Sequence, residues 1–345
     1  MLGKTCPSLF DLRNLFQVNV EEGRHLWAMV YLLHAYFGRD GREEAESLLE
    51  RNSGDQDNPR ILGTFNEPIS DWVSFFMFTY FTDRDGKYQL KSLAESSFDP
   101  LARTCQFMLT EEAHHMQVGE SGITRMIERT LEKMKELKTD SVDNIRNAGA
   151  VDLVTIQKYI NFWFSSSLDL FGSEISTNAA TAFANGLKGR PDEFRYNDHS
   201  EKNTLFNIEA CENGKIINKK VPMRNAMNEI TRQAYVDDCN IGIKRWNRLI
   251  KKYGYEEYSL ALPSTKFRRN IGVWANLSIN PKGEFINQDI YNRKLASWLP
   301  SENDKKFINS LMIQELDPGK TASWITKPRR GINNQEIDYS YVDLN

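Results

Sequence analysis

Two Glu-x-x-His pairs limit what this chain of 345 residues can fold into. The first pair is Glu22 with His25, and the second is Glu112 with His115. Both lie in apolar stretches that predict helices, and residues three apart on a helix share one face. Two facing helices of this kind, with one carboxylate from each of two further helices, form the six-ligand cage of a di-iron or di-manganese bundle.

Chance is the competing explanation for such pairs. A single pair occurs on many exposed helices, where the glutamate is solvated and the histidine bonds a carbonyl group in the core. Here two pairs lie ninety residues apart, and the chain contains only five histidines. Carboxylate and imidazole ligands together suit iron. The sequence therefore favours an iron site over two unrelated coincidences.

The second pair has two possible registers, because Glu111 and His114 also stand three apart. Adjacent helical residues are turned by about 100° from each other, so only one register can face a bundle core. Small or apolar residues one and two turns away favour Glu112 and His115 slightly. Glu111 and His114 then lie beside the site or support it.

A third carboxylate is expected from the helix between the pairs. Residues 72–83 are aromatic nearly all round, which predicts a buried helix, and Asp83 closes this stretch. Residues 84–86, Arg-Asp-Gly, are typical of a turn, so Asp83 could also be an ordinary helix-end residue. Glu67 and Asp71 are rival candidates, but they lie where the helix begins.

Four segments of the chain resemble the oxygenase component of benzoyl-CoA 2,3-epoxidase, a ferritin-like di-iron enzyme of aerobic benzoate breakdown. They are residues 21–33, 36–45, 110–119 and 330–335, and the stretch at 110–119 reads Thr-Glu-Glu-Ala-His-His-Met-Gln-Val-Gly. The resemblance implies a ligand set at matching spacing: Glu22, His25, Asp83, Glu112 and His115. It thereby selects the second register and places Asp83 above its rivals.

One departure from this family concerns the sixth ligand, a glutamate on a helix before the first pair. Only 21 residues precede Glu22, and their one aspartate is Asp11. We therefore expect a family member that lacks an N-terminal part, with an open flank beside Glu22 and His25 that exposes apolar surface. The alternative is that residues 1–20 fold back and place Asp11 at the metal.

The resemblance also implies an activity. Two iron ions would activate O2 and insert one oxygen atom across a ring double bond of benzoyl-CoA, while the other atom leaves as water. Two electrons would come from NADPH through a separate reductase that carries flavin or an iron–sulfur cluster, since this chain has no nucleotide-binding fingerprint. The alternatives are an inactive or metal-poor fragment of such a monooxygenase, and a ferritin-like iron oxidase or store without an organic substrate.

A CoA thioester requires cations for its phosphates and apolar walls for its acyl group. Arginine suits phosphate because its planar guanidinium can donate two hydrogen bonds at once. Two clusters of positive charge are candidates, although scattered surface charge would explain any one residue: Lys266, Arg268 and Arg269, and Lys327, Arg329 and Arg330. We expect a tunnel from the iron cage to at least one of these clusters.

Composition indicates a soluble cytoplasmic protein. The net charge of −3 argues against a partner such as nucleic acid or a membrane surface, and no apolar run is long enough to span a bilayer. The four cysteines show neither paired nor zinc-like spacing, as is typical of a reducing compartment.

The predicted architecture is mainly α: a ferritin-like helical bundle over 1–253 and a coil-rich C-terminal extension over 254–345, wrapped on the bundle. An Asn-Gly turn at 213–214 predicts a short hairpin, and short strands are expected at 272–278 and 338–342. The predicted helices lie near 12–38, 41–51, 68–83, 100–116, 121–137, 151–170, 174–187 and 222–253.

Overall fold

Helices dominate the computed structural model, which describes residues 2–196, 204–212 and 214–329. The mainly α prediction is therefore confirmed. Two strands, β1 (Leu205–Glu212) and β2 (Lys215–Pro222), form the expected antiparallel hairpin. The longer helices are α1 (Leu9–Tyr36), α2 (Gly38–Glu50), α3 (Trp72–Ala94), α4 (Asp99–Leu137), α5 (Val142–Asn147), α6 (Leu153–Leu168), α7 (Thr177–Ala184), α9 (Met223–Tyr253), α10 (Gln288–Trp298) and α11 (Glu302–Leu311).

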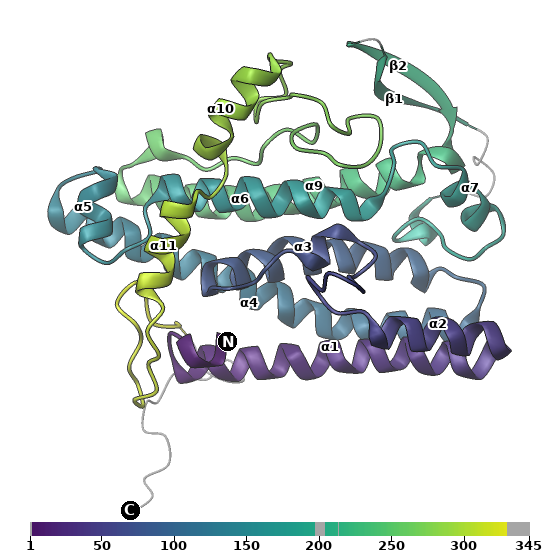
Figure 1. The fold of residues 1–345 in the computed structure, drawn as a ribbon, viewed down its shortest axis with the longest axis horizontal. Coiled ribbons are helices and arrows are strands. Elements are labelled where there is room, and N and C mark those ends of the chain that lie inside the picture. The colour runs from purple at the N-terminus through teal and green to yellow at the C-terminus, as the bar shows by residue number, and fades with distance from the viewer. Residues whose placement is uncertain (1, 197–203, 213, 330–345) are drawn as a thin grey trace, which may run out of the picture.

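Three layers of helices are visible in Figure 1. α1 and α2 lie on one side, α3 and α4 form the middle layer, and α6 and α9 lie on the other side. α3 is buried because aromatic side chains surround its first half, among them Trp72, Phe76 and Tyr80. Asp71 begins this helix by accepting a hydrogen bond from the backbone N–H of Ser74 at 2.7 Å.

Two glycines allow α3 and α4 to approach closely. A Cβ atom on Gly119 would lie 2.5 Å from the backbone nitrogen of Tyr80 and 2.7 Å from the carbonyl oxygen of Phe76. A Cβ atom on Gly122 would lie 2.2 Å from the ring of Phe76. Any side chain at these two positions would push the helices apart, and this contact therefore fixes how near α3 lies to the face of α4 that carries Glu112 and His115.

Several predicted boundaries were wrong. Residues 84–86 continue α3 instead of forming a turn, because Arg84 is buried against Asp238 and the ring of Tyr80. The two helices predicted at 100–116 and 121–137 are the single helix α4, and the helix predicted at 174–187 is shortened to α7. Residues 272–278 form turns and not a strand, while 338–342 lie outside the described residues.

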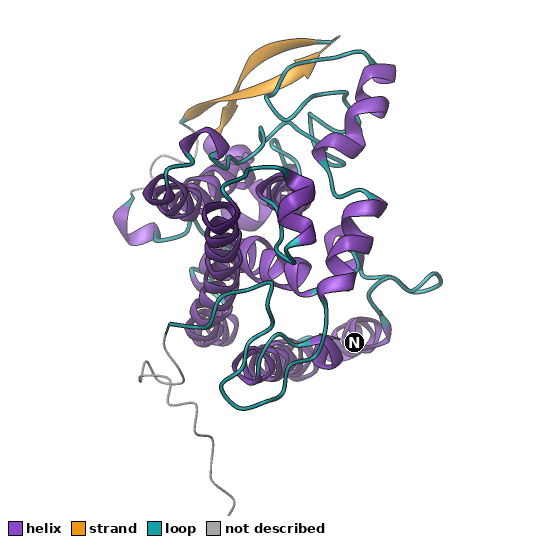
Figure 2. Ribbon diagram, turned by 90° about the vertical axis from the view of Figure 1, so that its left-hand side faces the viewer, coloured by secondary structure: helices purple, strands orange, loops and turns teal. Residues whose placement is uncertain are grey.

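The described part of the C-terminal extension contains α10 and α11, which lie to one side of the bundle, at the right in Figure 2. Beyond α11 the chain returns to the beginning of α1, where the backbone N–H of Ala322 donates to the carbonyl oxygen of Pro7 at 2.8 Å. Trp324 and Ile325 are buried in the main core. The division at residue 253 stays a prediction. Within the described residues, no helix is long and apolar enough to cross a membrane.

The outer face of α1 exposes large apolar side chains. Phe16, Val20, Trp27 and Tyr31 are 59–68% exposed, and their spacing places them in one stripe along the helix. At about 100° per residue, this stripe lies on the face of α1 opposite Glu22 and His25, so the open apolar flank expected beside that pair stays a prediction.

Candidate metal centre

The predicted ligands from α1, α3 and α4 meet at one place in the structure. One ligand atom from each of Glu22, Asp83, Glu112 and His115 lies within 4.8 Å of the others. The fifth predicted residue, His25, joins this group, because its Nδ1 lies 3.6 Å from Glu112 Oε1 and 3.7 Å from Glu22 Oε2. The two Glu-x-x-His pairs therefore face each other, as their spacing predicts.

The helices explain this convergence. α1 and α4 run in opposite directions, since Asp11 contacts Arg125 while His25 contacts Glu111. α3 contributes Asp83, which lies one turn beyond the close approach of Tyr80 to Gly119. Three of the residues, Asp83, Glu112 and His115, are buried, whereas the side chain of Glu22 is 48% exposed. The cage is thus closed on the side of α3 and more open on the side of α1.

A carboxylate on the opposite helix forms a hydrogen bond with Nε2 of each histidine, on the side of the ring away from the cage. His115 Nε2 donates a hydrogen bond to Glu21 Oε2 at 2.9 Å, and His25 Nε2 donates to Glu111 Oε2 at the same distance. A neutral ring that donates through Nε2 keeps a lone pair on Nδ1, and both Nδ1 atoms face the cage. These crosswise bonds therefore fix the tautomer and the direction of both rings.

The role of Glu21 was not predicted from the sequence, whereas Glu111 was expected to lie beside the site or to support it. The signal was present as two acidic doublets, because each Glu-x-x-His pair is preceded directly by a second glutamate. Arg24 lies between the two supporting carboxylates: it bonds Glu111, and its Nη2 is 3.8 Å from Glu21 Oε1. This guanidinium offsets part of the negative charge that gathers behind the histidines.

Burial and mutual repulsion perturb the acids of the cage. Burial, with the negative charges of Glu112 and Glu22, holds the pKa of Asp83 well above its ordinary value. Burial and Glu22 raise the pKa of Glu112 to about 7. Burial opposes the charged form of His115, but its contact with Glu22 and the charges of Asp83 and Glu112 outweigh this and raise its pKa to about 9. The metal-free cage therefore retains protons near neutral pH.

The residues fit a bound cation. Asp83 Oδ2, Glu112 Oε2 and His115 Nδ1 are buried and have no hydrogen-bond partner among the described residues. Leaving such polar atoms unpaired is costly, and a cation placed among them would satisfy all three. Two carboxylate oxygens and one imidazole nitrogen are also a donor set that suits iron. The cluster can therefore hold metal; that all five residues are ligands stays a prediction.

The rival carboxylates have other partners. Asp71 caps α3, and Glu67 lies 3.6 Å from Arg268. Asp11 does not reach the cage, because it is buried in an ion pair with Arg125 at 2.7 Å. The alternative that places Asp11 at the metal is therefore wrong.

Comparison with known proteins identifies the family of this chain. Residues 22–145, which include all five predicted ligands, match the family described as phenylacetic acid catabolic protein. The chain is 56% identical over all of its 345 residues to benzoyl-CoA oxygenase component B of Aromatoleum evansii, and it covers 73% of that protein. This chain belongs to the benzoyl-CoA oxygenase component B family. The resemblance and the ferritin-like fold class expected from the sequence are thereby confirmed.

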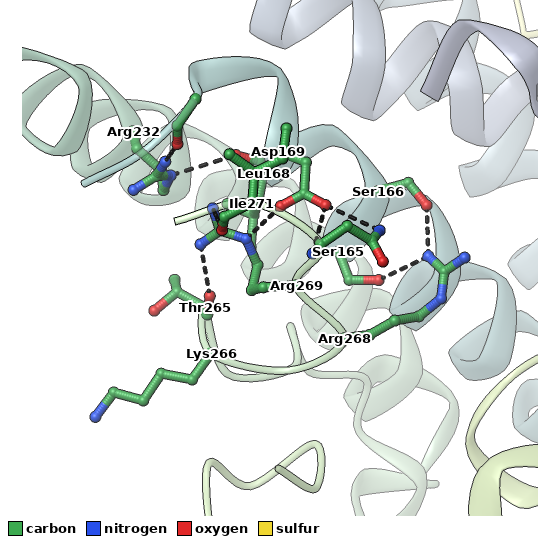
Figure 3. Close-up of polar contacts among 12 residues, drawn as sticks. Ser165, Ser166, Leu168, Asp169, Arg232, Thr265, Lys266, Arg268, Arg269 and Ile271 are labelled. Carbon is green, nitrogen blue, oxygen red and sulfur yellow. Dashed lines mark hydrogen bonds and ion pairs between the residues drawn. The ribbon is translucent and has the colours of Figure 1, made fainter. Parts of the chain in front are cut away.

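In the first basic cluster, Lys266, Arg268 and Arg269, the two arginines bond other residues of the protein, as Figure 3 shows. Arg269 is only 3% exposed and bonds Asp169 at 2.6 Å and Glu174 at 2.9 Å. Arg268 donates to Ser166, while Lys266 points away from Arg269 and pairs with Glu209 at 2.7 Å. A role of this cluster in substrate binding stays a prediction, and the burial of Arg269 argues against that residue.

The second basic cluster borders a cavity of about 1000 Å³. Arg329 lines this cavity and pairs with Glu128 at 2.7 Å, and the opposite end of the lining includes His114. Arg330 lies outside the described residues, and Lys327 is not among the lining residues. The cavity reaches residues directly beside the cage, but none of the five predicted ligands lines it. A continuous tunnel from the cage to this cluster stays a prediction.

Proposed function

We propose that this chain is the oxygenase component that converts benzoyl-CoA to its 2,3-epoxide. One atom of O2 is added across a ring double bond and the other leaves as water, with two electrons from NADPH delivered by a separate reductase. The observation that carries this proposal is the cage in which both histidine Nδ1 atoms face three carboxylates. Family membership supplies the substrate class.

In this proposal, Glu22, His25, Asp83, Glu112 and His115 hold two iron ions. Iron, when bound, supplies the reduction of O2 that organic side chains cannot perform. The described residues support this role, because Asp83 Oδ2 and Glu112 Oε2 are buried and have no hydrogen-bond partner among them. A bound cation would favour their ionised forms and release the protons that they retain without it.

The protein's own contribution is orientation and the exclusion of water. Glu21 and Glu111 keep Nε2 of each histidine protonated, so that Nδ1 remains available toward the cage. Burial of His115 and Glu112 against α3 keeps bulk water away from this side of the cage. The more exposed side at Glu22 is where substrate or O2 can approach.

The test uses the full chain loaded anaerobically with Fe²⁺ and supplied with NADPH, a reductase of this system and benzoyl-CoA under ¹⁸O2. We expect a product that has gained one ¹⁸O atom in the ring. His115→Ala should lose iron and product formation together. Glu132→Gln, which removes a carboxylate from the same helix at a site paired with Arg129, should retain both.

Two results would contradict the proposal in different ways. Consumption of O2 and Fe²⁺ with unchanged benzoyl-CoA would favour a ferritin-like iron oxidase. A chain that retains no iron under any of these conditions would refute the assignment of the cage as a metal site.

A further inference from the structure

An exposed patch of aromatic and arginine side chains lies where α1 and α4 run side by side. It consists of Arg24, Trp27 and Tyr31 on α1 with Arg103 and Phe107 on α4, and is called the α1–α4 patch. We propose that the α1–α4 patch docks the protein that supplies electrons to the metal cage, and that acidic side chains of this partner contact the two arginines. This assignment rests on the proposed function, which requires a separate electron donor but does not say where the donor binds.

The residues of the patch form one continuous surface. Its members on each helix are three, four or seven positions apart, so they share one face of that helix. α1 and α4 run in opposite directions and stay side by side from Arg24, which bonds Glu111, to Tyr36, whose ring centre lies 5.3 Å from that of Phe98. The residues that follow Arg24 therefore lie alongside the residues that precede Glu111.

The aromatic side chains of the patch are of the kind that binds proteins. Trp27 is 61% exposed, Tyr31 is 68% exposed and Phe107 is 59% exposed. Aromatic residues and arginine are enriched at protein interfaces, and contiguous exposed apolar side chains mark an interaction surface. The small size of the patch suits a transient contact of the kind that redox partners make.

The charges of the patch favour an acidic partner. The side chains of Arg24 and Arg103 are 53% and 74% exposed, and Arg103 pairs with Asp99 through only one of its nitrogens. The carboxylate that Arg24 bonds, Glu111, is only 10% exposed, so the surface presents the guanidinium group and not the carboxylate. A donor with carboxylates around its cofactor would be attracted to this surface, which speeds its association.

A short chain of hydrogen bonds leads from the patch to a predicted metal ligand. Arg24 bonds one oxygen of the Glu111 carboxylate, and the other oxygen accepts the hydrogen bond of His25 Nε2 at 2.9 Å. Electron transfer slows steeply with distance, and hydrogen-bonded contacts carry electrons better than gaps do. On the opposite side of the cage, α3 and the layer of α6 and α9 lie between the ligands and the surface, as Figure 1 shows. The α1–α4 patch therefore offers electrons a shorter route than that side.

The redox balance of this transfer is simple. The flavin or iron–sulfur cluster of the donor is oxidised by one electron for each bound ferric ion that is reduced to ferrous. The residues of the patch are neither oxidised nor reduced, and no proton has to cross it.

Docking at the patch leaves the exposed side of the cage free. Glu22, on that side, is two positions before Arg24, and two positions on a helix correspond to a turn of about 200°. The electron donor therefore approaches a face of α1 nearly opposite to the one where substrate or O2 can approach, and both can be present at once.

The closing experiment measures the Kd of the full chain for the NADPH-dependent reductase of this system by isothermal titration calorimetry. Trp27→Ala and Phe107→Ala should each raise this Kd about tenfold, because large aromatic residues at an interface contribute most to affinity. The matched control is Phe194→Ala, which removes an aromatic side chain that is 80% exposed and lies outside the patch. It should leave the Kd unchanged.

A charge reversal tests the acidic character of the partner. Arg103→Glu should raise the Kd about tenfold and make binding less sensitive to salt. Its control is Arg39→Glu, which reverses an exposed charge on α2 that pairs with Glu43. Equal effects of the two variants would contradict a specific contact at Arg103.

A kinetic measurement separates docking from damage to the cage. At a low concentration of reductase, the iron(III)-loaded variants Trp27→Ala and Phe107→Ala should be reduced by NADPH about tenfold more slowly than wild type, in line with their Kd. Their reduction by dithionite should match wild type, because this small reagent needs no docking surface. Slower reduction by both reagents would refute the role of the patch in docking.

The outcomes also separate this inference from the proposed function. A Kd that is equal in wild type and in all patch variants would overturn the docking assignment. So would sedimentation that shows a dimer of wild type and a monomer of Trp27→Ala, since the patch would then bind a second copy of this chain. The proposed function is decided independently by a single turnover of chain reduced beforehand with dithionite, because ¹⁸O incorporation from benzoyl-CoA and ¹⁸O2 then requires no reductase.

Discussion

Removal of the Glu21 carboxylate should weaken metal binding through His115, although Glu21 does not face the cage. Glu21 is 7% exposed and His115 is fully buried, and their 2.9 Å bond joins an imidazole to a carboxylate. A buried hydrogen bond with a charged partner contributes about 1.5–3 kcal/mol. If all of this energy serves to orient the His115 ring toward the metal, losing the hydrogen bond lowers metal affinity by about tenfold to a hundredfold. Removal of other carboxylates that bond histidine ligands typically has an effect of this size.

The assay is a chelator competition with Co²⁺, whose visible spectrum reports the ligand set. Affinity should fall in the order wild type, Glu21→Gln, Glu21→Ala, because glutamine keeps an acceptor but loses the charge. Glu111→Ala should give a similar loss through His25, since that bond has the same length. Glu132→Gln is the control for removal of a carboxylate elsewhere on α4. Wild-type affinity in Glu21→Ala would refute the reasoning, as would an equal loss in the control.

Three further predictions concern the metal-free chain and the helix contact. The pKa values of Glu112 and His115 are raised from 4.5 and 6.5 to about 7 and about 9, so their contribution to the free energy of unfolding is lost as pH rises from 5 to 9. Thermal unfolding should show a falling Tm over this range, and a saturating metal should reverse the trend. Asp83→Asn should abolish metal binding. In urea unfolding at pH 8 it should also raise the free energy of unfolding of the metal-free chain by about 1–3 kcal/mol, because burial disfavours the charged form of the Asp83 carboxyl group. A variant that is less stable than wild type would contradict this. Gly119→Ala should cost about 1–3 kcal/mol by the same measurement, because the new Cβ meets the backbone of Tyr80, whereas Gly23→Ala, with open space around it, should not.

The sequence predicted the helical elements better than their ends. Aromatic residues all round the first half of α3 indicated a buried helix, and the structure has one. The turn expected at residues 84–86 was wrong because tertiary contacts of Arg84 override the local preference of Asp-Gly for a turn. The hairpin was predictable because the Asn-Gly pair between the two strands is a local sequence signal for a tight turn.

The candidate site was predictable where it depends on helical periodicity. Glu22 with His25 and Glu112 with His115 lie on shared faces because the helix repeat demands it. The support of His115 by Glu21 was not predictable in this way, since the two residues are 94 positions apart and only the register of α1 on α4 brings them together. The same holds for the cavity at Arg329, which forms only when distant segments meet.

The crosswise bonds also govern how these helices can change in the course of evolution. Glu21 and Glu22 are neighbours in the chain, but Glu21 forms its hydrogen bond with His115 on the other helix, as Glu111 does with His25. A substitution at one of these positions is tolerated best when its partner on the other helix changes with it. Among related chains, covariation should therefore connect the first glutamate of each doublet with the histidine of the other helix, and not with the glutamate beside it.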